Sequence, residues 1–170
     1  MNLNEKLVGR KKQISARWLD ALLSTYKSQG AKFFKETSNE FANPVGTTFH
    51  ASLDSLVGFL LQGERGDGIE NAVDGLVRIR AVQGFAPSVA TGFVFAIKKI
   101  LQDEAGSDLL ASDGAREWKS IEARIDEMTC IAFDLYMQCR EKIWKHKANH
   151  LYNRTSKLLI KSHLIEEVTD

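Results

Sequence analysis

The sequence predicts an all-α protein: a single helical bundle with a last helix much longer than the others. Its only two prolines, Pro44 and Pro87, each stand where a helix would begin. No segment alternates between apolar and polar residues over the length of a strand. From about Asp113 onward there is no proline, and after Gly114 no glycine, which predicts one helix of about fifty residues, or roughly 75 Å.

Two helices are expected before the first proline. The first spans about Asn4–Tyr26, and its inner stripe at helical spacing is Leu7, Ile14, Trp18, Leu22 and either Tyr26 or Thr25. The second, about Ala31–Glu40, carries three aromatic residues on it or just after it, namely Phe33, Phe34 and Phe41.

Two further helices are expected between the prolines. Asn43 supplies an N-cap and Pro44 a first helical residue, and Gly63 is expected to end that helix. Its inner face is formed by Val45, Phe49, Leu53, Leu56 and Leu60. Asp67 and Glu70 have the spacing of a capping box, which starts a fourth helix with Ile69, Val73, Leu76 and Val77 facing inward.

The fifth helix is expected from Pro87 to about Glu104. It is apolar nearly all round, which is typical of a helix at the centre of a bundle. Gly92 would let a neighbouring helix approach closely at that point. The loop Gly106–Ser112 then leads into the long helix.

A seam of apolar residues with alternating spacings of three and four runs along the first half of the long helix. This spacing is typical of a coiled-coil pairing, so we predict a dimer interface formed by Trp118, Ile121, Ile125, Met128 and Leu135. The alternative is that the same residues pack against the first and fifth helices inside one monomer.

The same seam becomes polar after Cys139. Polar seam positions forgo apolar burial, so we expect weaker packing there and a pairing that a signal can shift. Leu151, Leu158 and Ile165 form a separate, weak apolar row with heptad spacing. We therefore divide the chain into a helical sensor domain, residues 1–140, and a basic helical extension, residues 141–170.

The charge is distributed unevenly along the chain. Residues 36–134 hold 16 acidic and 8 basic side chains, whereas residues 137–163 hold 7 basic side chains and only Glu141 as an acidic one. A basic extension attracts acidic partners, nucleic acid or anionic lipid, although solvated helix faces have similar composition. Because aromatic residues are sparse there and no recognition-helix pattern occurs, an acidic protein is expected rather than nucleic acid.

Few residues occur in patterns typical of catalytic or metal-binding sites. There is no glycine-rich phosphate loop, nucleophile elbow or pair of carboxylates in an apolar context, so no enzyme is predicted. His146 and His150, with Cys139 on about the same face, could ligate a metal, but the basic surroundings disfavour a cation. His50 is the one histidine in the bundle available to a haem. We predict no metal and no cofactor.

The cysteines, the apolar runs and the amino-terminal residues together predict the cellular compartment. Cys130 and Cys139 are nine residues apart on one helix, hence on opposite faces, and cannot pair with each other. No apolar run is long enough to span a bilayer, and the amino-terminal residues are charged where a signal peptide is apolar. A cytoplasmic protein with reduced thiols, not inserted in a membrane, is expected.

One polar residue stands on an inner face. Arg80 follows Leu76 by one turn and about 40°, so it is expected to point inward and to need a carboxylate or carbonyl partner, for which Asp126 or Asp134 would serve. A structural pair and a ligand-binding arginine both remain open. The candidate ligand pocket consists of Phe49, Arg80, Phe93 and Phe95.

Four stretches carry a resemblance to a known family: ISARWLDALLSTY, FANPVG, LVRIRAVQGFAPSVATGFVFAIKKI, and EARIDEMTCIAFDLYMQCREKIW with the later NRTSKLL. Over about residues 13–159 the chain resembles the RsbRD amino-terminal domain family, related to the RsbT co-antagonists of bacterial stress signalling. The resemblance implies a globin-like, cofactor-free sensory domain that dimerises through its last helices and signals along its carboxy-terminal helix into a STAS domain or a kinase. No such module follows in this sequence, and no catalytic residue is transferred.

The function expected from these observations is a non-enzymatic bacterial sensor or adaptor. It would work as a homodimer and act through its last helix on a signalling partner in trans. Two alternatives stay open. One is a small-molecule or lipid carrier, and the other is a metal- or haem-dependent redox sensor.

Overall fold

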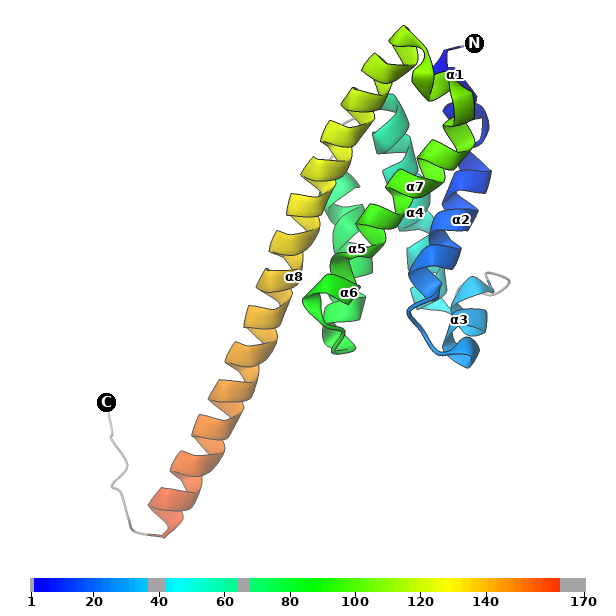
Figure 1. The fold of residues 1–170 in the computed structure, drawn as a ribbon. Coiled ribbons are helices and arrows are strands. Elements are labelled where there is room, and N and C mark those ends of the chain that lie inside the picture. The colour runs from blue at the N-terminus through cyan, green and yellow to red at the C-terminus, as the bar shows by residue number, and fades with distance from the viewer. Residues whose placement is uncertain (1, 37–41, 64–67, 163–170) are drawn as a thin grey trace.

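The computed structural model describes residues 2–36, 42–63 and 68–162, which form an all-α bundle with one helix running far beyond it (Figure 1). The prediction of an all-α domain with a long carboxy-terminal helix is confirmed. The elements in chain order are α1 (Leu3–Gly9), α2 (Lys11–Leu23), α3 (Ser28–Lys35), α4 (Pro44–Gln62), α5 (Gly68–Val82), α6 (Pro87–Thr91), α7 (Phe93–Ala105), a 3-10 turn η1 (Gly106–Leu110) and α8 (Ser112–Lys161).

The first predicted helix is divided into α1 and α2. The backbone leaves the helical conformation at Arg10 (φ −107°, ψ 11°), directly after Gly9, a poor helix former. The expected inner stripe is nevertheless correct, since its members on these two helices, Leu7, Ile14, Trp18 and Leu22, are buried. The prediction of a single helix was wrong because an apolar stripe can continue across a short break.

Asn43 joins α3 to α4. Its side-chain oxygen accepts a hydrogen bond from the Gly46 amide at 2.9 Å, which confirms the predicted cap. Its amide nitrogen donates to the Phe33 and Glu36 carbonyls at 2.6 and 2.5 Å. The same residue therefore caps α4 and satisfies the end of α3, which begins three residues earlier than predicted and ends at Lys35.

Two predicted features near these helices have different outcomes. Gly63 ends α4 in the left-handed conformation (φ 70°), as expected. Phe41, and Asp67 of the predicted capping box, lie outside the described residues.

The predicted helix from Pro87 to Glu104 is two helices, α6 and α7, which meet at Gly92. A Cβ atom on Gly92 would lie 2.4 Å from the Ser88 carbonyl oxygen, so the glycine accommodates its own preceding turn rather than a neighbouring helix. The expectation of an apolar surface nearly all round was also too broad, because Val89 and Phe95 are exposed.

A carboxylate on α7 fastens α1 and α2 to the bundle. Glu104 is buried, and its oxygens accept hydrogen bonds from Arg10 at 2.9 Å, Arg17 at 2.6 Å and Gln13 at 3.2 Å. Burial by itself raises the pKa of Glu104, but the hydrogen bonds from Arg17 and Arg10 outweigh it and lower that pKa. This cluster holds the amino-terminal helices in place.

The first half of α8 is part of the bundle and packs mainly against α5, with further contacts to α1, α4, α6 and α7. Its second half leaves the bundle, as Figure 1 shows in the orange and red part of the ribbon. The hydroxyl of Tyr136 donates to the Phe85 carbonyl at 2.7 Å near the place of departure.

Candidate functional site

The four residues of the predicted ligand pocket differ in burial and in their neighbours. Phe49 is fully buried and packs edge-on against Phe34, with ring centroids 5.7 Å apart. Phe93 is buried and packs against Trp18. Phe95 points outward and is 59% exposed.

Arg80 points into the bundle, as predicted, and is fully buried. Its guanidinium donates to the Val89 carbonyl at 2.7 Å and to the Thr25 hydroxyl at 3.0 Å. It lies over the rings of Tyr26 and Phe85, at 5.4 and 4.7 Å from their centroids. Burial lowers the pKa of Arg80.

The partners expected for Arg80 on the last helix were wrong, because Asp126 and Asp134 are exposed. Carbonyl and hydroxyl oxygens of α6 and of the end of α2 take their place. The arginine therefore links α5 to both segments, which is a structural role.

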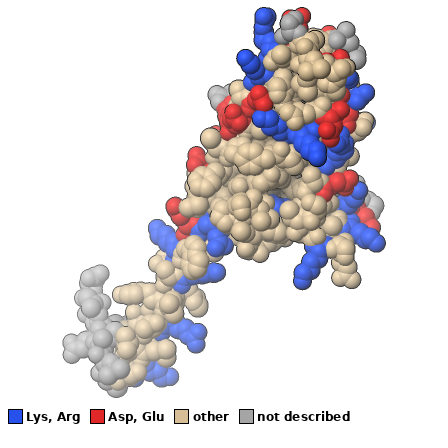
Figure 2. Space-filling view, viewed as in Figure 1, with Lys and Arg blue, Asp and Glu red and all other residues tan. Residues whose placement is uncertain are grey.

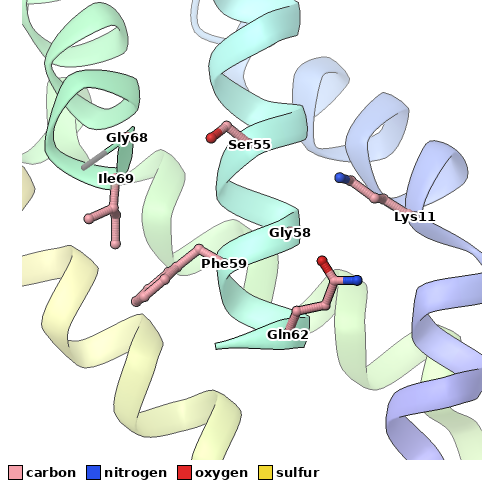
Figure 3. A pocket seen from close by; sticks show the side chains of 7 residues that line it. All are labelled: Lys11, Ser55, Gly58, Phe59, Gln62, Gly68 and Ile69. Carbon is pink, nitrogen blue, oxygen red and sulfur yellow. The ribbon is translucent and has the colours of Figure 1, made fainter. Parts of the chain in front are cut away.

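Two open pockets lie elsewhere, and sequence patterns gave no signal for either. One, of about 310 Å³, is lined by Lys11, Ser55, Gly58, Phe59, Gln62, Gly68 and Ile69. Figure 3 shows Lys11 reaching from α2 toward α4 there. The other, of about 330 Å³, is lined by Lys12, Ser15, Ala16, Leu19, Asp20, Lys35, His50, Leu53 and Asp54. Neither contains a residue of the predicted pocket.

The residues of the predicted dimer interface lie mostly inside one chain. Ile121, Ile125 and Met128 are buried in the core, and Trp118 and Leu135 are half-buried against it. These side chains are covered chiefly because α5 packs along the same face of α8. The packing within one monomer that was expected as the alternative is thus present. Its main partner is α5, while α1, α6 and α7, which belong to the first and fifth predicted helices, also contact α8.

Exposed apolar side chains are present on α6, α7 and α8, helices that contact one another. Lys98 of α7 forms an ion pair with Glu122 of α8 at 2.6 Å, which fixes the side of α8 that faces α7. Phe133 lies eleven residues after Glu122, three turns and about 20° further, so it is on that side. We call Val89, Phe95, Phe133 and Met137, exposed apolar residues on three helices that contact one another, the edge patch; Phe133 is 53% exposed.

Beyond the bundle, α8 is uncovered on all sides in the monomer. Every residue from Trp144 to Thr155 is exposed. Three large apolar residues in heptad spacing belong to this extension: Trp144, Leu151 and Leu158 are 59%, 65% and 57% exposed. On the face shown in Figure 2, Lys and Arg side chains stand out along the extension among uncharged ones.

Among the residues that the structure describes, no group of three or more His, Cys, Asp or Glu could hold a metal ion. His146 and His150 are exposed, and the ring of His50 lies 3.3 Å from the Lys35 carbonyl. Cys130 is exposed, Cys139 is half-buried, and both are free thiols. Within the same residues, no helix has the length and apolar content needed to cross a membrane.

The fold and its surfaces define an all-α domain with a projecting helix. Residues 12–151 match the family described as RsbT co-antagonist protein rsbRD N-terminal domain, and the chain belongs to that family. The family is one of stressosome-type signalling domains rather than a known family of enzymes. Neither the curated proteins nor the solved structures include a match to this chain.

Proposed function

We propose that this chain is a non-enzymatic sensor or adaptor domain that acts on a signalling partner in trans through the extension of α8. The observation that carries the proposal is that every residue from Trp144 to Thr155 is exposed, on a helix that also bears large apolar residues. Exposed apolar side chains arranged along a helix are typical of a surface that a partner covers. Membership of a signalling family supports the same conclusion.

The proposal includes a division of labour within the chain. Residues 1–140 form the bundle that receives the signal, and the helix from residue 141 onward delivers it. The protein works in the cytoplasm, in keeping with its two free cysteines and its signalling family.

A genetic experiment tests the output. Trp144→Ser and Leu151→Ser, introduced together into the chromosomal gene, should abolish the stress response to the same extent as deletion of the gene, at unchanged protein level. The control is His146→Ser with Asn153→Ser, two exposed residues on the opposite side of the same helix. An intact response in the Trp144 and Leu151 double variant would refute the proposal.

We also propose a homodimer formed through the edge patch of Val89, Phe95, Phe133 and Met137. This patch replaces the predicted seam, whose central residues are already buried within one chain. Phe95→Glu with Phe133→Glu should give a folded monomer by light scattering. The control Leu110→Glu, at a residue that is 89% exposed on η1, should remain a dimer. A dimer in both variants would rule out this interface.

A further inference from the structure

We infer that the surface of the extension is built to bind an acidic amphipathic α helix of a partner protein. This inference rests on the proposed output through α8 and adds the chemistry of the partner. The first support is a row of apolar residues spaced seven apart along the chain: Met137, Trp144, Leu151 and Leu158. The row covers 21 residues, or about 32 Å of helix.

The spacing of this row favours a helix as its occupant. Seven residues fall about 20° short of two full turns, so the row winds slowly around α8, as the seam of a left-handed coiled coil does. The positions between its members, at spacings of four and then three, are Glu141, Ala148 and Thr155. Ala148 and Thr155 are small, which leaves room for the side chains of a second helix to insert between the large ones.

A basic row flanks the apolar row along one side. Arg140, Lys147 and Arg154 each precede a member of the apolar row by four residues, and Lys161 continues the series. Residues four apart are neighbours on a helix surface. The guanidinium of Arg140 and the ammonium of Lys147 lie 5.7 and 5.2 Å from the centre of the Trp144 ring.

These cations lack carboxylate partners among the described residues, where no ion pair involving the basic row is found. In a coiled coil, the positions beside the apolar seam pair with charged residues of the partner and thereby select it. A uniformly basic flank therefore selects glutamate and aspartate at the facing positions.

A second copy of the same extension fits less well. Residues 137–163 carry seven basic side chains and one acidic one, a net charge of +6, so pairing two extensions brings like charges together. An anionic membrane also fits less well, because Glu141 stands inside the apolar stripe between Met137 and Trp144. A protein partner can place a basic or polar residue opposite Glu141, and this position would fix the register.

The test uses the full-length protein and synthetic helical peptides of four heptads. The acidic probe has leucine seam positions, glutamate at both flanking rows and one arginine to face Glu141. The basic probe has the same seam with lysine flanks, and a third probe keeps the glutamates but has serine seams. Titration calorimetry should show binding of the acidic probe, at least about tenfold tighter than either of the others, and weakening with salt.

Matched variants locate the binding surface. The double variant Lys147→Gln with Arg154→Gln should weaken binding of the acidic probe at least about tenfold. The double variant Lys142→Gln with Lys157→Gln removes the same charge from the other side of the helix and should change the affinity little. Equal losses from the two pairs would overturn the inference, since net charge and not the basic row would then govern binding.

Two competing occupants give distinct results. Binding to vesicles of phosphatidylcholine and phosphatidylglycerol that is tighter than binding to the acidic probe would assign the surface to lipid and overturn the inference. Loss of the dimer in Trp144→Ser with Leu151→Ser, without any binding of the acidic probe, would assign it to a second copy. If the acidic probe fails while the genetic experiment still shows that the extension is required, this inference fails and the proposed function stands.

Discussion

Arg78 and Arg80 stand two residues apart on α5 and face different surroundings. Arg78 is exposed and pairs with Asp74 on the surface, while Arg80 is buried and holds carbonyl oxygens of two other segments. Because a truncated buried side chain leaves a cavity and unpaired carbonyls, Arg80→Ala should lower the free energy of unfolding by about 3 to 5 kcal/mol. Urea denaturation measures this change, and Arg78→Ala should cost no more than about 1 kcal/mol. Similar losses in both variants would contradict the structural role of Arg80.

Asn43 supports a second prediction at the scale of residues. At an ordinary N-cap, aspartate replaces asparagine at little cost. Here the side-chain nitrogen donates to the Phe33 and Glu36 carbonyls, and an aspartate would present oxygen to both. Asn43→Asp should therefore be at least as destabilising as Asn43→Ala, by about 2 to 3 kcal/mol in thermal or urea unfolding. If Asn43→Asp retains the stability of the native chain, the two carbonyl contacts are unimportant.

For single residues, the sequence predicted whether a side chain points inward better than it predicted which atoms that side chain contacts. The helical angle from Leu76 placed Arg80 inside correctly, and the Asn43-Pro44 pair identified the cap. Two of the oxygens that Arg80 contacts are the backbone carbonyls of Leu22 and Val89, and every residue has such a carbonyl. The third is the Thr25 hydroxyl. Side-chain patterns therefore pointed to Asp126 and Asp134, which are exposed. The exposure of Phe95, at 59%, was not predicted either, since apolar residues at helical spacing do not reveal which neighbour each one meets.

Among the elements, α8 passes from buried to exposed surroundings without a break in its helical backbone. In α8 the residues Ile121 and Met128 are buried by the bundle, whereas Trp144 to Thr155 are exposed. Helix without tertiary packing has low local stability. We therefore expect amides beyond about residue 145 to exchange with solvent much faster than those of Ile121–Leu135 in the isolated protein. Hydrogen exchange with mass spectrometry measures both segments in one sample, and equal protection would show that the extension is rigid by itself.

Element boundaries show where sequence patterns are sufficient. The absence of proline and glycine after Gly114 predicted α8 almost to the residue, because nothing interrupts its backbone. The breaks at Arg10 and Gly92 were not predicted, since the apolar positions on both sides stay in phase. The spacing of Ile121, Ile125 and Met128 correctly marked a buried face of α8. That pattern cannot distinguish burial by α5 from burial by a second chain, because both require the same residues.

For the whole molecule, the cluster around Glu104 links stability to pH. The lowered pKa of Glu104 means that the ionised form is favoured by folding. Its contribution is therefore fully present above the ordinary pKa of a glutamate, about 4.3, and is lost as the pH falls through the lower folded value. Glu104→Gln should destabilise the protein near pH 7 and flatten the loss of stability on acidification. Urea unfolding at a series of pH values tests this.

Asp103 offers the matched control for that experiment. It pairs with Arg17 at 2.7 Å but is largely exposed, so Asp103→Asn should have a much smaller effect on both the stability and its pH dependence. If both variants follow the same curve as the native chain, acid sensitivity originates in other carboxylates.

The point where α8 leaves the bundle gives the molecule the geometry of a lever. Its last hydrogen bond to the bundle described here joins Tyr136 to the Phe85 carbonyl, just ahead of α6. From Tyr136 to Lys161 the helix continues for 25 residues, about 37 Å, so a tilt of about 5° at that fulcrum displaces the tip by about 3 Å. A shift of the Gly84–Pro87 turn too small to disturb the core would thus be magnified at the far end. A displacement of that size is enough to move side chains out of register with those of a bound helix.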